Sequence, residues 1–394
     1  MQYVNIPKDW KVVKLSQIVK LRNGKRPNKL TEDGYPIYGA NGPMGYTDSW
    51  LVDREFVIVI GRVGASGEVH LASGKIWVSD NAIYTAEYNS DFVYMPFLFY
   101  LLKFMNLKRF ATKTTHPIIT QKQIRKLQIP LPSLDEQRRI VKVLSTVDEA
   151  IAKTDAIISR IEDLRRALLD YLMTHGIEHR EYRETEIGKI PKEWKIAKLK
   201  DVIFKALGGG TPSTKNLKYW NGDIPWMTSV GIPEDDIYIT KGERFITEEG
   251  LKNSAANVIP KGNLIIATRV GLGKAGVNTI DIAINQDLVG LIIDKKVVIP
   301  EFLAYYIRSS RTLSYITAHA RGTTIKGISK QVLFNLKVPI PALKEQREIV
   351  DILDDLNKLV KNESKRKEKL ESVKKGLMTL LLTGKVSVKD LPID

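Results

Sequence analysis

Two long segments of the chain place apolar residues at every third or fourth position. They run from Leu134 to Thr174 and from Leu343 to Thr383. Within them the apolar series extends from Ile140 to Tyr171 and from Ile349 to Leu380, and only Lys367 interrupts it. Proline before each segment and glycine after it are typical helix start and stop signals. The pattern predicts two helices of about 40 residues, each roughly 60 Å long.

The apolar stripe of each predicted helix is narrow, which indicates packing against another helix along its length. Because each helix finds a matching stripe in the other, an antiparallel or parallel pair within the chain is the economical arrangement. The alternative is that each amphipathic helix packs separately on its own domain. A helix of this length is too long to lie on one small domain.

The segments that precede the two helices show the pattern of mixed α/β (α+β) domains. Short β-branched and aromatic runs, such as residues 56–60 and 264–267, alternate with Gly, Asn and Asp turns and predict strands. A helical run follows in each segment, at residues 97–104 and 302–307. The pattern therefore predicts globular domains over residues 1–130 and 181–340, with the long helices and their connectors over residues 131–180 and 341–394.

The chain contains an internal duplication of one domain-plus-helix unit. Residues 6–11 recur as residues 190–195, with an offset of 184 residues. Residues 129–138 recur as residues 338–347, with an offset of 209 residues. The second copy is therefore about 25 residues longer, and nearly all of the difference lies before Arg269.

The chain is strongly basic, but the long helices are not. Lys and Arg number 61 against 45 Asp and Glu, which gives a net charge of +16 and favours a polyanionic partner such as nucleic acid or an anionic membrane surface. Residues 134–174 carry 7 basic and 8 acidic residues, and residues 343–383 carry 10 and 8. We therefore expect the phosphate-binding face on the globular domains, and spacing and partner contacts on the helices.

Composition excludes several classes of protein. The chain has no cysteine, which rules out disulfides, cysteine zinc sites and iron–sulfur clusters and fits a reducing cytoplasm. The first 14 residues contain no apolar run, so no signal peptide is expected. The most apolar window, residues 92–102, is shorter than the roughly 20 residues that span a bilayer, so no membrane association is expected.

Motifs of enzymes fail on their context. Residues 271–276 match the dinucleotide-binding glycine pattern, but a strand-like run follows them, so a β-turn is expected. Residues 208–211 lack the Gly-Lys-Ser/Thr of a phosphate loop. His175 and His179 have no third ligand beside them, so no metal site is expected. The chain contains no Pro-Pro, which excludes the Asn/Asp-Pro-Pro-aromatic motif of base methyltransferases.

Candidate DNA contacts are the basic, amide, hydroxyl and aromatic residues of the domain loops, because such side chains bond to base edges and phosphates. In the first domain the candidates are Arg22, Lys25, Arg26, Tyr38, Asn41, Tyr46, Arg62, Lys113, Thr114, Thr115 and His116. In the second domain they are Thr211, Ser213, Thr214, Lys215, Tyr219, Asn221, Thr228, Ser229, Arg269, Lys274, Arg321, Thr323, Thr324 and Lys326. The alternative for such residues is a structural role, with Trp220 and Trp226 in the core and the Asn-Gly pairs in hairpin turns.

Several motifs follow one another in a fixed order. They are Gly209-Gly210-Thr211-Pro212-Ser213, the segment from Tyr219 to Trp226, the connector 184–188 with Ile190-Pro191-Lys192-Glu193-Trp194, and two Pro-X-Pro-X-Leu-X-Glu-Gln-Arg helix entries. With these motifs the chain resembles the DNA-specificity subunit of type I restriction-modification systems over essentially its whole length. The first domain departs from the pattern with Asn23-Gly24-Lys25-Arg26-Pro27, as expected if the two domains recognise different sequences.

The resemblance implies two target-recognition domains, each of which recognises one half of a split site in double-stranded DNA. It implies that the two long helices form an antiparallel coiled coil with a pseudo-twofold arrangement that sets the gap between the half-sites. It also implies a non-catalytic chain without a cofactor, since S-adenosylmethionine, ATP and Mg²⁺ belong to partner modification and restriction subunits.

Two modification (methyltransferase) subunits are expected to dock on equivalent helix surfaces. The candidate partner-binding residues are those of the helix entries: Glu136, Gln137, Arg138, Glu345, Gln346 and Arg347. The alternative functions are a stand-alone nucleic-acid-binding repeat protein and a DNA-cutting enzyme. For the latter the sequence offers no cluster of two carboxylates and a lysine.

Overall fold

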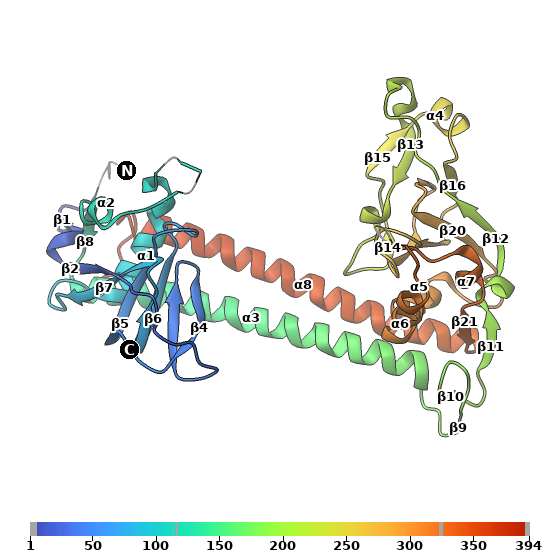
Figure 1. Cartoon of the computed structure of the whole chain (residues 1–394), viewed down its shortest axis with the longest axis horizontal. Coiled ribbons are helices and arrows are strands. Elements are labelled where there is room, and N and C mark those ends of the chain that lie inside the picture. Colours follow the sequence, from blue (N-terminus) through green and yellow to red (C-terminus); the bar gives the residue numbers. More distant parts are fainter. Residues whose placement is uncertain (1–5, 113, 116, 323–325, 391–394) are drawn as a thin grey trace. The chain divides into compact units, whose positions relative to one another are not determined.

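The computed structural model describes residues 6–112, 114–115, 117–322 and 326–390. The chain divides into two compact units, each with one globular domain and a part of both long helices (Figure 1). Unit 1 comprises Met1–Asp155 and Lys365–Asp394, and unit 2 comprises Ala156–Ser364. Domain 1 and domain 2 denote here the globular parts of unit 1 and unit 2.

The two predicted long helices are confirmed. Helix α3 spans Leu134–His175 and helix α8 spans Leu343–Leu381. Gly176 and Gly384 follow the two helices with φ angles of 66° and 69°, in the left-handed region that ends helices. A Cβ at Gly176 would lie 2.4 Å from Glu345 Oε1, and one at Gly384 would lie 2.4 Å from Pro7 Cδ. Both helices therefore end where the chain has no room for a side chain.

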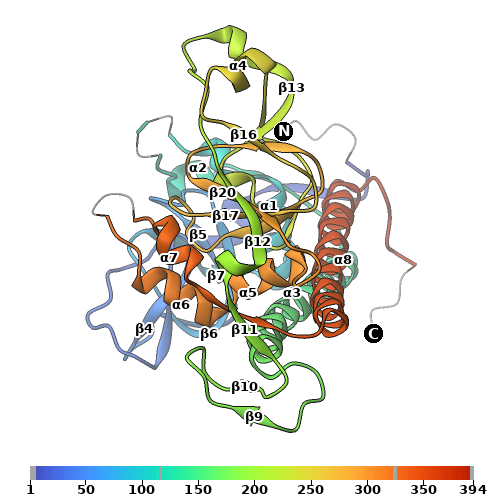
Figure 2. The ribbon, with the colours of Figure 1, turned by 90° about the vertical axis from the view of Figure 1, so that its right-hand side faces the viewer.

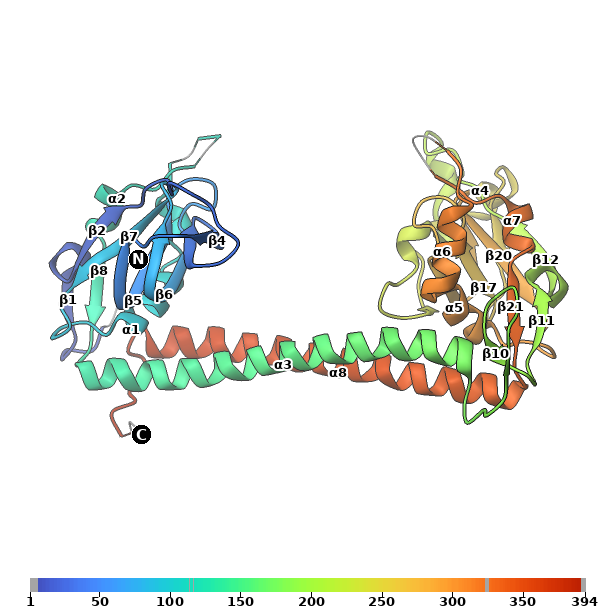
Figure 3. The ribbon, with the colours of Figure 1, turned by 60° about the horizontal axis from the view of Figure 1, so that its bottom comes forward.

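Helices α3 and α8 pack against each other and run antiparallel within each unit (Figure 3). The polar contacts between them are Asp148–Lys374 and Asp155–Lys367 in unit 1 and Arg165–Asn357 in unit 2. Higher residue numbers on α3 therefore meet lower numbers on α8. Lys367, which interrupts the apolar series, is the residue whose Nζ lies 2.7 Å from Asp155 Oδ1.

The apolar stripes are broader than the helix contact needs. We predicted that Leu164, Tyr171, Val373 and Leu380 belong to the stripe between the helices, but these side chains are 54%, 52%, 52% and 39% exposed. The rest of each stripe suffices for the pairing. In each unit the exposed positions thus form a second apolar surface that the described residues do not cover.

Domain 1 contains a six-stranded sheet in the order β2-β7-β5-β6-β3-β4, in which only β3 and β6 pair in parallel. The strands are β2 (Val19–Asn23), β3 (Tyr35–Gly39), β4 (Gly42–Thr47), β5 (Val52–Gly61), β6 (Val69–Val78) and β7 (Ala82–Tyr88). The other elements are β1 (Lys11–Lys14), which pairs with β8 (Gln128–Leu131), and helices α1 (Met95–Phe104) and α2 (Gln121–Arg125). Strand β5 carries Val57-Ile58-Val59-Ile60, all fully buried, as its central place requires.

Helix α1 connects the sheet of domain 1 to the long helices. Phe97 and Leu101 of α1 belong to one core cluster with Ile58 of β5 and with Ile140 and Leu144 of α3. Pro96 lies in the first turn of α1, where its missing N–H costs nothing. The N-terminal part of α3 is therefore an integral part of the unit 1 core.

Domain 2 contains two larger sheets, in the orders β12-β20-β17-β18-β14 and β15-β13-β19-β16, and two two-stranded sheets, β10-β9 and β11-β21. The strands are β9 (Tyr182–Arg183), β10 (Ile190–Pro191), β11 (Lys195–Lys198), β12 (Ile203–Gly208), β13 (Trp220–Met227), β14 (Tyr238–Ile239), β15 (Arg244–Ile246), β16 (Asn257–Ile259), β17 (Leu264–Ala267), β18 (Ala275–Asn278), β19 (Ile282–Ile284), β20 (Leu288–Ile293) and β21 (Lys337–Ile340). The helices are α4 (Glu248–Lys252), α5 (Pro300–Arg308), α6 (Ser310–Ala318) and α7 (Lys330–Phe334). Figures 1 and 2 place α4 and β13 at the end of domain 2 that is farther from α3.

Domain 2 meets its part of the long helices as domain 1 does. Phe302 of α5 shares a core cluster with Ile349 and Leu353 of α8, and strand β11 pairs antiparallel with β21 just before α8 begins. Gly271 and Gly273 have φ angles of 74° and 82° and form a turn that leads into β18. The predicted turn is therefore confirmed.

Candidate nucleic-acid interface

One turn of domain 1 gathers loops that lie far apart in the sequence. This central turn of domain 1, residues 78–82, connects β6 to β7. The backbone N–H of Lys25 donates to Val78 O at 2.8 Å, and that of Ser79 donates to Tyr38 O at 2.9 Å. Arg62 donates its backbone N–H to Asn81 O at 2.8 Å. The structure therefore brings Lys25, Tyr38 and Arg62 to one edge of the domain.

The loop that contains Thr114 and Thr115 lies beside Arg62. The N–H of Ile119 donates to Arg62 O at 3.1 Å, and Thr112 closes the loop with an N–H bond to Ile118 O at 2.9 Å. Lys113 and His116, also predicted DNA contacts, lie outside the described residues. Two predicted groups, the Arg62 turn and the Thr-Thr loop, therefore belong to one surface.

Domain 2 repeats this arrangement around its own central turn, residues 284–288, between β19 and β20. The N–H of Gly210 donates to Ile284 O at 2.9 Å, and that of Asn285 donates to Met227 O at 3.0 Å. Thr268, beside Arg269, donates its N–H to Asp287 O at 2.8 Å. The two domains thus build the candidate interface from the same backbone hydrogen bonds.

In domain 2 the described ends of the corresponding loop, Arg321 and residues 326–328, again lie beside an Arg-Val-Gly turn, residues 269–271. Arg321 and Gly327 exchange backbone hydrogen bonds at 2.9 and 2.8 Å, and Ile328 N–H donates to Thr268 O at 2.8 Å. Arg269 Nε lies 3.7 Å from Asp287 Oδ1, so its side chain is held at the central turn. Lys326 is exposed on the same loop, whereas Thr323 and Thr324 lie outside the described residues.

A glycine permits the close approach to the central turn in each domain. A Cβ on Gly24 would lie 2.1 Å from Ser79 O, and one on Gly209 would lie 2.2 Å from Ile284 O and from Asn285 O. No side chain fits at such distances. The two motifs Asn-Gly-Lys-Arg-Pro and Gly-Gly-Thr-Pro differ in letters but share this glycine, which explains how both serve the same fold.

The gathered loops present cations that the protein does not neutralise. Lys25, Arg26, Lys215, Arg321 and Lys326 are all exposed, and none forms an ion pair within the described part of the chain. Arg22 differs, because its Nη2 lies 3.7 Å from Glu87 Oε1. Unpaired cations on one edge of a domain are suited to bind phosphates.

Uncharged candidates surround these cations. Tyr46, Asn41, Thr211, Ser213, Thr214 and Asn221 are exposed. Asn41 lies in the β3–β4 hairpin turn, as the structural alternative expects, whereas Asn221 has a φ of 62° within a bulge of strand β13 and forms no hairpin turn. Thr211 Oγ1 donates to Gln286 Oε1 at 2.7 Å. Exposed hydroxyl and amide groups beside unpaired cations fit contacts to base edges.

Four predicted contacts of domain 2 do not fit DNA binding. Ser229 is 4% exposed, and the Thr228 hydroxyl donates to the Glu243 carboxylate at 2.9 Å. Lys274 Nζ lies 2.7 Å from Glu234 Oε1 and lines a cavity beside α3. Tyr219 is partly buried against the core cluster of Trp220 and Trp226. Packing and ion pairing occupy these side chains.

The structural alternative is confirmed for the two tryptophans. Both are 4% exposed, and their rings meet edge to face with centroids 5.3 Å apart. Trp220 Nε1 donates to Ser213 O at 3.2 Å, and Trp226 Nε1 donates to Gly210 O at 3.0 Å. The tryptophans therefore hold the 210–213 loop in place instead of contacting DNA.

The glutamines of the helix entries are structural, contrary to the expectation that they contact a partner. Gln137 and Gln346 are fully buried. Gln137 Oε1 accepts from Tyr94 N–H at 2.7 Å, and Gln346 Oε1 accepts from Ile299 N–H at 2.9 Å. Each glutamine thereby fixes the start of a long helix to the segment before α1 or α5.

The glutamates of the helix entries are also enclosed. Glu345 accepts hydrogen bonds from Trp194 Nε1 at 3.0 Å, His179 Nε2 at 2.8 Å and the Ile177 N–H at 3.0 Å. Glu136, its repeat equivalent, is 2% exposed, and burial raises the pKa of its carboxyl above the ordinary value of 4.5. Of the predicted partner contacts only Arg138 and Arg347 remain exposed.

Sequence inspection missed the central turns themselves. Their polar residues are Ser79-Asp80-Asn81 in domain 1 and Asn285-Gln286-Asp287 in domain 2. Gln121 was also missed, although its Nε2 donates to Asn23 Oδ1 at 2.8 Å beside the same surface. The available signal was a polar triplet between two apolar runs, at equivalent places in both copies.

Residues 6–112, 114–115, 117–322 and 326–390 contain neither a membrane-spanning helix nor a metal-binding cluster. Within these ranges no helix combines the length and the apolar character needed to cross a membrane. In the same part of the chain, no three His, Cys, Asp or Glu residues gather into a group able to hold a metal ion.

The sequence of the chain is similar to those of known proteins. Residues 7–163 and 191–372 match the family described as the type I restriction modification DNA specificity domain. A type I restriction enzyme specificity subunit of Methanocaldococcus jannaschii, MjaVIII, is 29% identical over 99% of this chain and 96% of its own length. A second one from that organism, MjaIX, is 37% identical over 49% of this chain and 44% of its own length.

Solved structures show the same fold. The S subunit of a type I restriction-modification system from M. genitalium matches with a TM-score of 0.60 over 96% of this chain and 98% of its own, at 16% identity. A chain from a structure concerned with complex assembly and conformational transition of the type I system matches with a TM-score of 0.61 over 97% and 100%, at 18% identity.

Proposed function

The chain belongs to the family of type I restriction-modification DNA specificity proteins, and from this premise we propose that each of its domains recognises one half of a bipartite site in double-stranded DNA. One observation carries the proposal. The same backbone hydrogen bonds surround residues 78–82 and residues 284–288, but the side chains around the two turns differ. A shared scaffold with different side chains is what recognition of two different half-sites requires.

The chemistry of this surface divides between position and sequence. Lys25, Arg26, Lys215, Arg321 and Lys326 would bind phosphates, which fixes each domain on the duplex without sequence information. Thr211 and its hydrogen-bonded partner Gln286 would face base edges. This division explains how two domains of one fold can bind DNA in the same manner and still prefer different bases.

The chain itself would carry out no chemistry and hold no cofactor. We assign S-adenosylmethionine, ATP and Mg²⁺ to the modification and restriction subunits of the assembly, which would act on DNA in the cytoplasm. The relatives are named specificity subunits, which supports a division of labour between recognition and catalysis.

The modification subunits would dock on the second apolar surface of the long helices. In unit 2 this surface contains Ile157, Leu164 and Tyr171 of α3, spaced seven residues apart, together with Ile352 and Leu359 of α8. In unit 1 it contains Val373 and Leu380. An exposed apolar stripe with a seven-residue period fits a further helix supplied by a partner.

A domain exchange tests the two-domain proposal. Residues 18–118 are replaced by the matching segment of a relative, and the methylated sites of cells that express the chain with its partner subunits are sequenced. We expect one half of the methylated sequence to change and the other half to stay the same, because domain 2 keeps its own central turn and loops. A change in both halves would contradict the proposal.

A further inference from the structure

A cavity of about 310 Å³ lies within unit 2, between domain 2 and the long helices. Its apolar lining consists of Leu169, Leu272, Leu313 and Leu353. Its polar lining consists of Arg165, Arg166, Glu234, Asp235, Lys274, Tyr305, Arg308 and Asn357. This volume lies at the lower end of the range for small-ligand pockets, and apolar walls with a few convergent polar groups are their usual composition.

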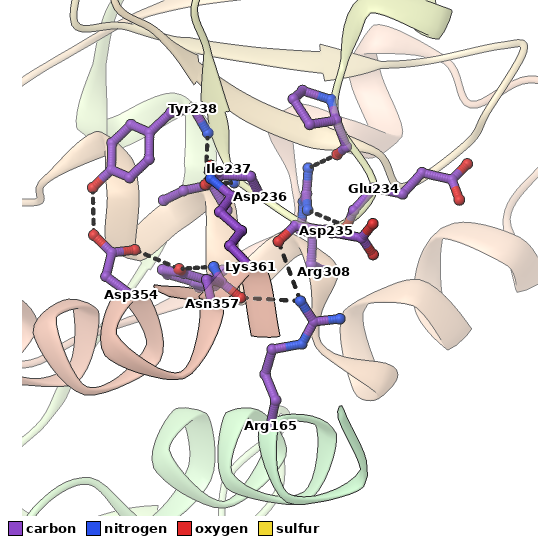
Figure 4. Close-up of polar contacts among 12 residues, drawn as sticks. Arg165, Glu234, Asp235, Asp236, Ile237, Tyr238, Arg308, Asp354, Asn357 and Lys361 are labelled. Carbon is purple, nitrogen blue, oxygen red and sulfur yellow. Dashed lines mark hydrogen bonds and ion pairs between the residues drawn. The ribbon is translucent and has the colours of Figure 1, made fainter. Parts of the chain in front are cut away.

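Arg308 is a partly buried cation that forms no ion pair within the described part of the chain. Its Nη1 donates to Glu234 O at 3.0 Å and Nη2 to Pro233 O at 2.6 Å (Figure 4). Its Nε donates to Ala275 O at 2.7 Å. No carboxylate of the described residues forms an ion pair with it. Burial lowers the pKa of Arg308 to about 10, so the guanidinium stays charged at neutral pH.

Arg165 is a second partly buried cation, and none of the residues in the described ranges forms an ion pair with it. Its Nη1 donates to Asn357 Oδ1 at 3.0 Å and to Asp235 O at 3.2 Å. The Asn357 amide is oriented from its other side, because Nδ2 donates to the Tyr305 hydroxyl at 2.8 Å, and that hydroxyl donates to Asp354 Oδ1 at 2.5 Å. The Asn357 amide oxygen therefore accepts a hydrogen bond from Arg165 but does not neutralise its charge (Figure 4).

The repeat supplies an internal comparison. With the offset of 209 residues, Asn357 corresponds to Asp148 and Arg165 to Lys374. In unit 1 Lys374 forms an ion pair with Asp148, which also accepts a hydrogen bond from the Tyr100 hydroxyl at 2.6 Å. Unit 1 thus neutralises its cation at this place, whereas unit 2 has an amide there.

Three acidic residues near the cavity, residues 234–236, do not form ion pairs with Arg165 or Arg308. Glu234 Oε1 lies 2.7 Å from Lys274 Nζ and is occupied by that pair. Asp236 pairs with Lys361 of α8. Asp235 is exposed, and its carboxylate pairs with neither guanidinium within the described part of the chain. Partly buried cations without a counter-ion are costly, and a bound anion removes that cost.

We propose that this cavity binds an organic anion, a carboxylate on an apolar body about the size of an amino-acid side chain. Arg165 and Arg308 bind the carboxylate, and Leu169, Leu313 and Leu353 pack against the apolar body. The site exists in unit 2 only, since Asp148 fills the anionic role in unit 1. The proposal is independent of DNA recognition by the two domains.

Fluorine NMR of the purified full chain tests the site. The probe is 4-(trifluoromethyl)benzoate, and its neutral control of the same shape is 4-(trifluoromethyl)benzamide. We expect saturable binding of the benzoate. The benzamide is expected to bind at least about tenfold more weakly than the benzoate, because only the benzoate supplies a charge. Equal binding of the two compounds, or no binding of the benzoate, would overturn the proposal. Displacement of the probe by an equal concentration of inorganic phosphate would show that the cavity binds small anions in general. That result would overturn the proposed contact between the leucines and the apolar body of the ligand.

Three variants locate the binding. Asn357→Asp supplies the carboxylate that unit 1 has, and Arg165→Gln removes one cation, so each is expected to weaken benzoate binding about tenfold. Asp148→Asn makes the reverse change in unit 1 and is expected to leave the affinity of the unit 2 cavity for benzoate unchanged. Thermal melting confirms that each variant is folded, and Arg165→Gln decides if Asn357→Asp does not fold. Unchanged binding in the folded cavity variants, or an equal loss in Asp148→Asn, would overturn the assignment.

The source of the natural anion is found by competition. Addition of the modification subunit to the chain loaded with probe displaces the benzoate if an Asp or Glu side chain of that partner occupies the cavity. Retention of the probe in the assembled complex identifies a free organic acid as the ligand.

Discussion

At the scale of single residues, several close fits lie around the two central turns. Gly209 has no space for a Cβ, and the indoles of Trp220 and Trp226 donate to carbonyls of the neighbouring loop. None of these residues is placed to contact a base. They hold in place the loops that carry the proposed DNA contacts.

Gly209→Ala tests this role. The added Cβ would meet the carbonyl oxygens of Ile284 and Asn285, so we expect a loss of about 1–3 kcal/mol in the free energy of unfolding. Chemical denaturation measures it. Gly376→Ala in α8 is the matched control, because nothing lies within 4 Å of its Cβ position, and it is expected to stabilise by about 0.5–1 kcal/mol. Equal effects of both changes would refute the close approach.

Glu136→Gln tests the buried carboxyl of the first helix entry. Burial raises its pKa in the folded protein, and the nearby Lys389 ammonium offsets part of that rise. The unfavourable contribution of the carboxylate is therefore complete above the folded pKa and absent below the ordinary value of 4.5. We expect the variant to melt at a higher temperature than the parent at pH 7, with the difference vanishing as the pH falls below 4.5.

Glu345→Gln is the control for this experiment. Its carboxylate accepts hydrogen bonds from Trp194, His179 and the Ile177 N–H, so the amide is expected to lower the melting temperature at pH 7. Stabilisation by both changes, or by neither, would contradict the difference between the two helix entries.

At the scale of elements, periodicity predicted the long helices and their ends correctly. It overestimated how much of each apolar stripe the other helix covers, since one stripe has the same spacing whether its contacts come from the chain or from a partner. The central turns escaped prediction for another reason. Their loops meet through backbone hydrogen bonds between residues such as Lys25 and Val78, which no side-chain pattern encodes.

Leu164→Glu tests the second apolar surface. Leu164 is 54% exposed, so the change should cost the isolated chain little, within about 0.5 kcal/mol. A buried leucine contributes about 1.5–3 kcal/mol to an interface, so affinity for the modification subunit should fall about tenfold or more. Analytical ultracentrifugation of the mixture measures this. Ser159→Glu places the same charge at another exposed position of α3 and should leave assembly intact; equal weakening by both would argue against the stripe.

At the scale of the whole molecule, the duplication explains the charge distribution. The net charge of +16 belongs almost entirely to the domains, where unpaired cations such as Lys25 and Lys326 lie, and the long helices are close to neutral. Sequence alone identified the two copies and the family that they resemble from motifs in a fixed order. It could not separate side chains that face DNA from those, like Ser229, that the fold encloses, because both occur in the same loops.

We expect the paired helices to set the gap between two independently recognised half-sites. Seven residues are inserted into α3 after Asp155 and seven into α8 after Ser364, which adds two turns to both helices and keeps their apolar register. Methylome sequencing of cells that express this chain with its partner subunits then measures the recognised site. We expect unchanged half-sites separated by about three more base pairs, because seven residues add roughly 10 Å to each helix. An unchanged gap, or an altered half-site, would contradict the spacing role of the helices.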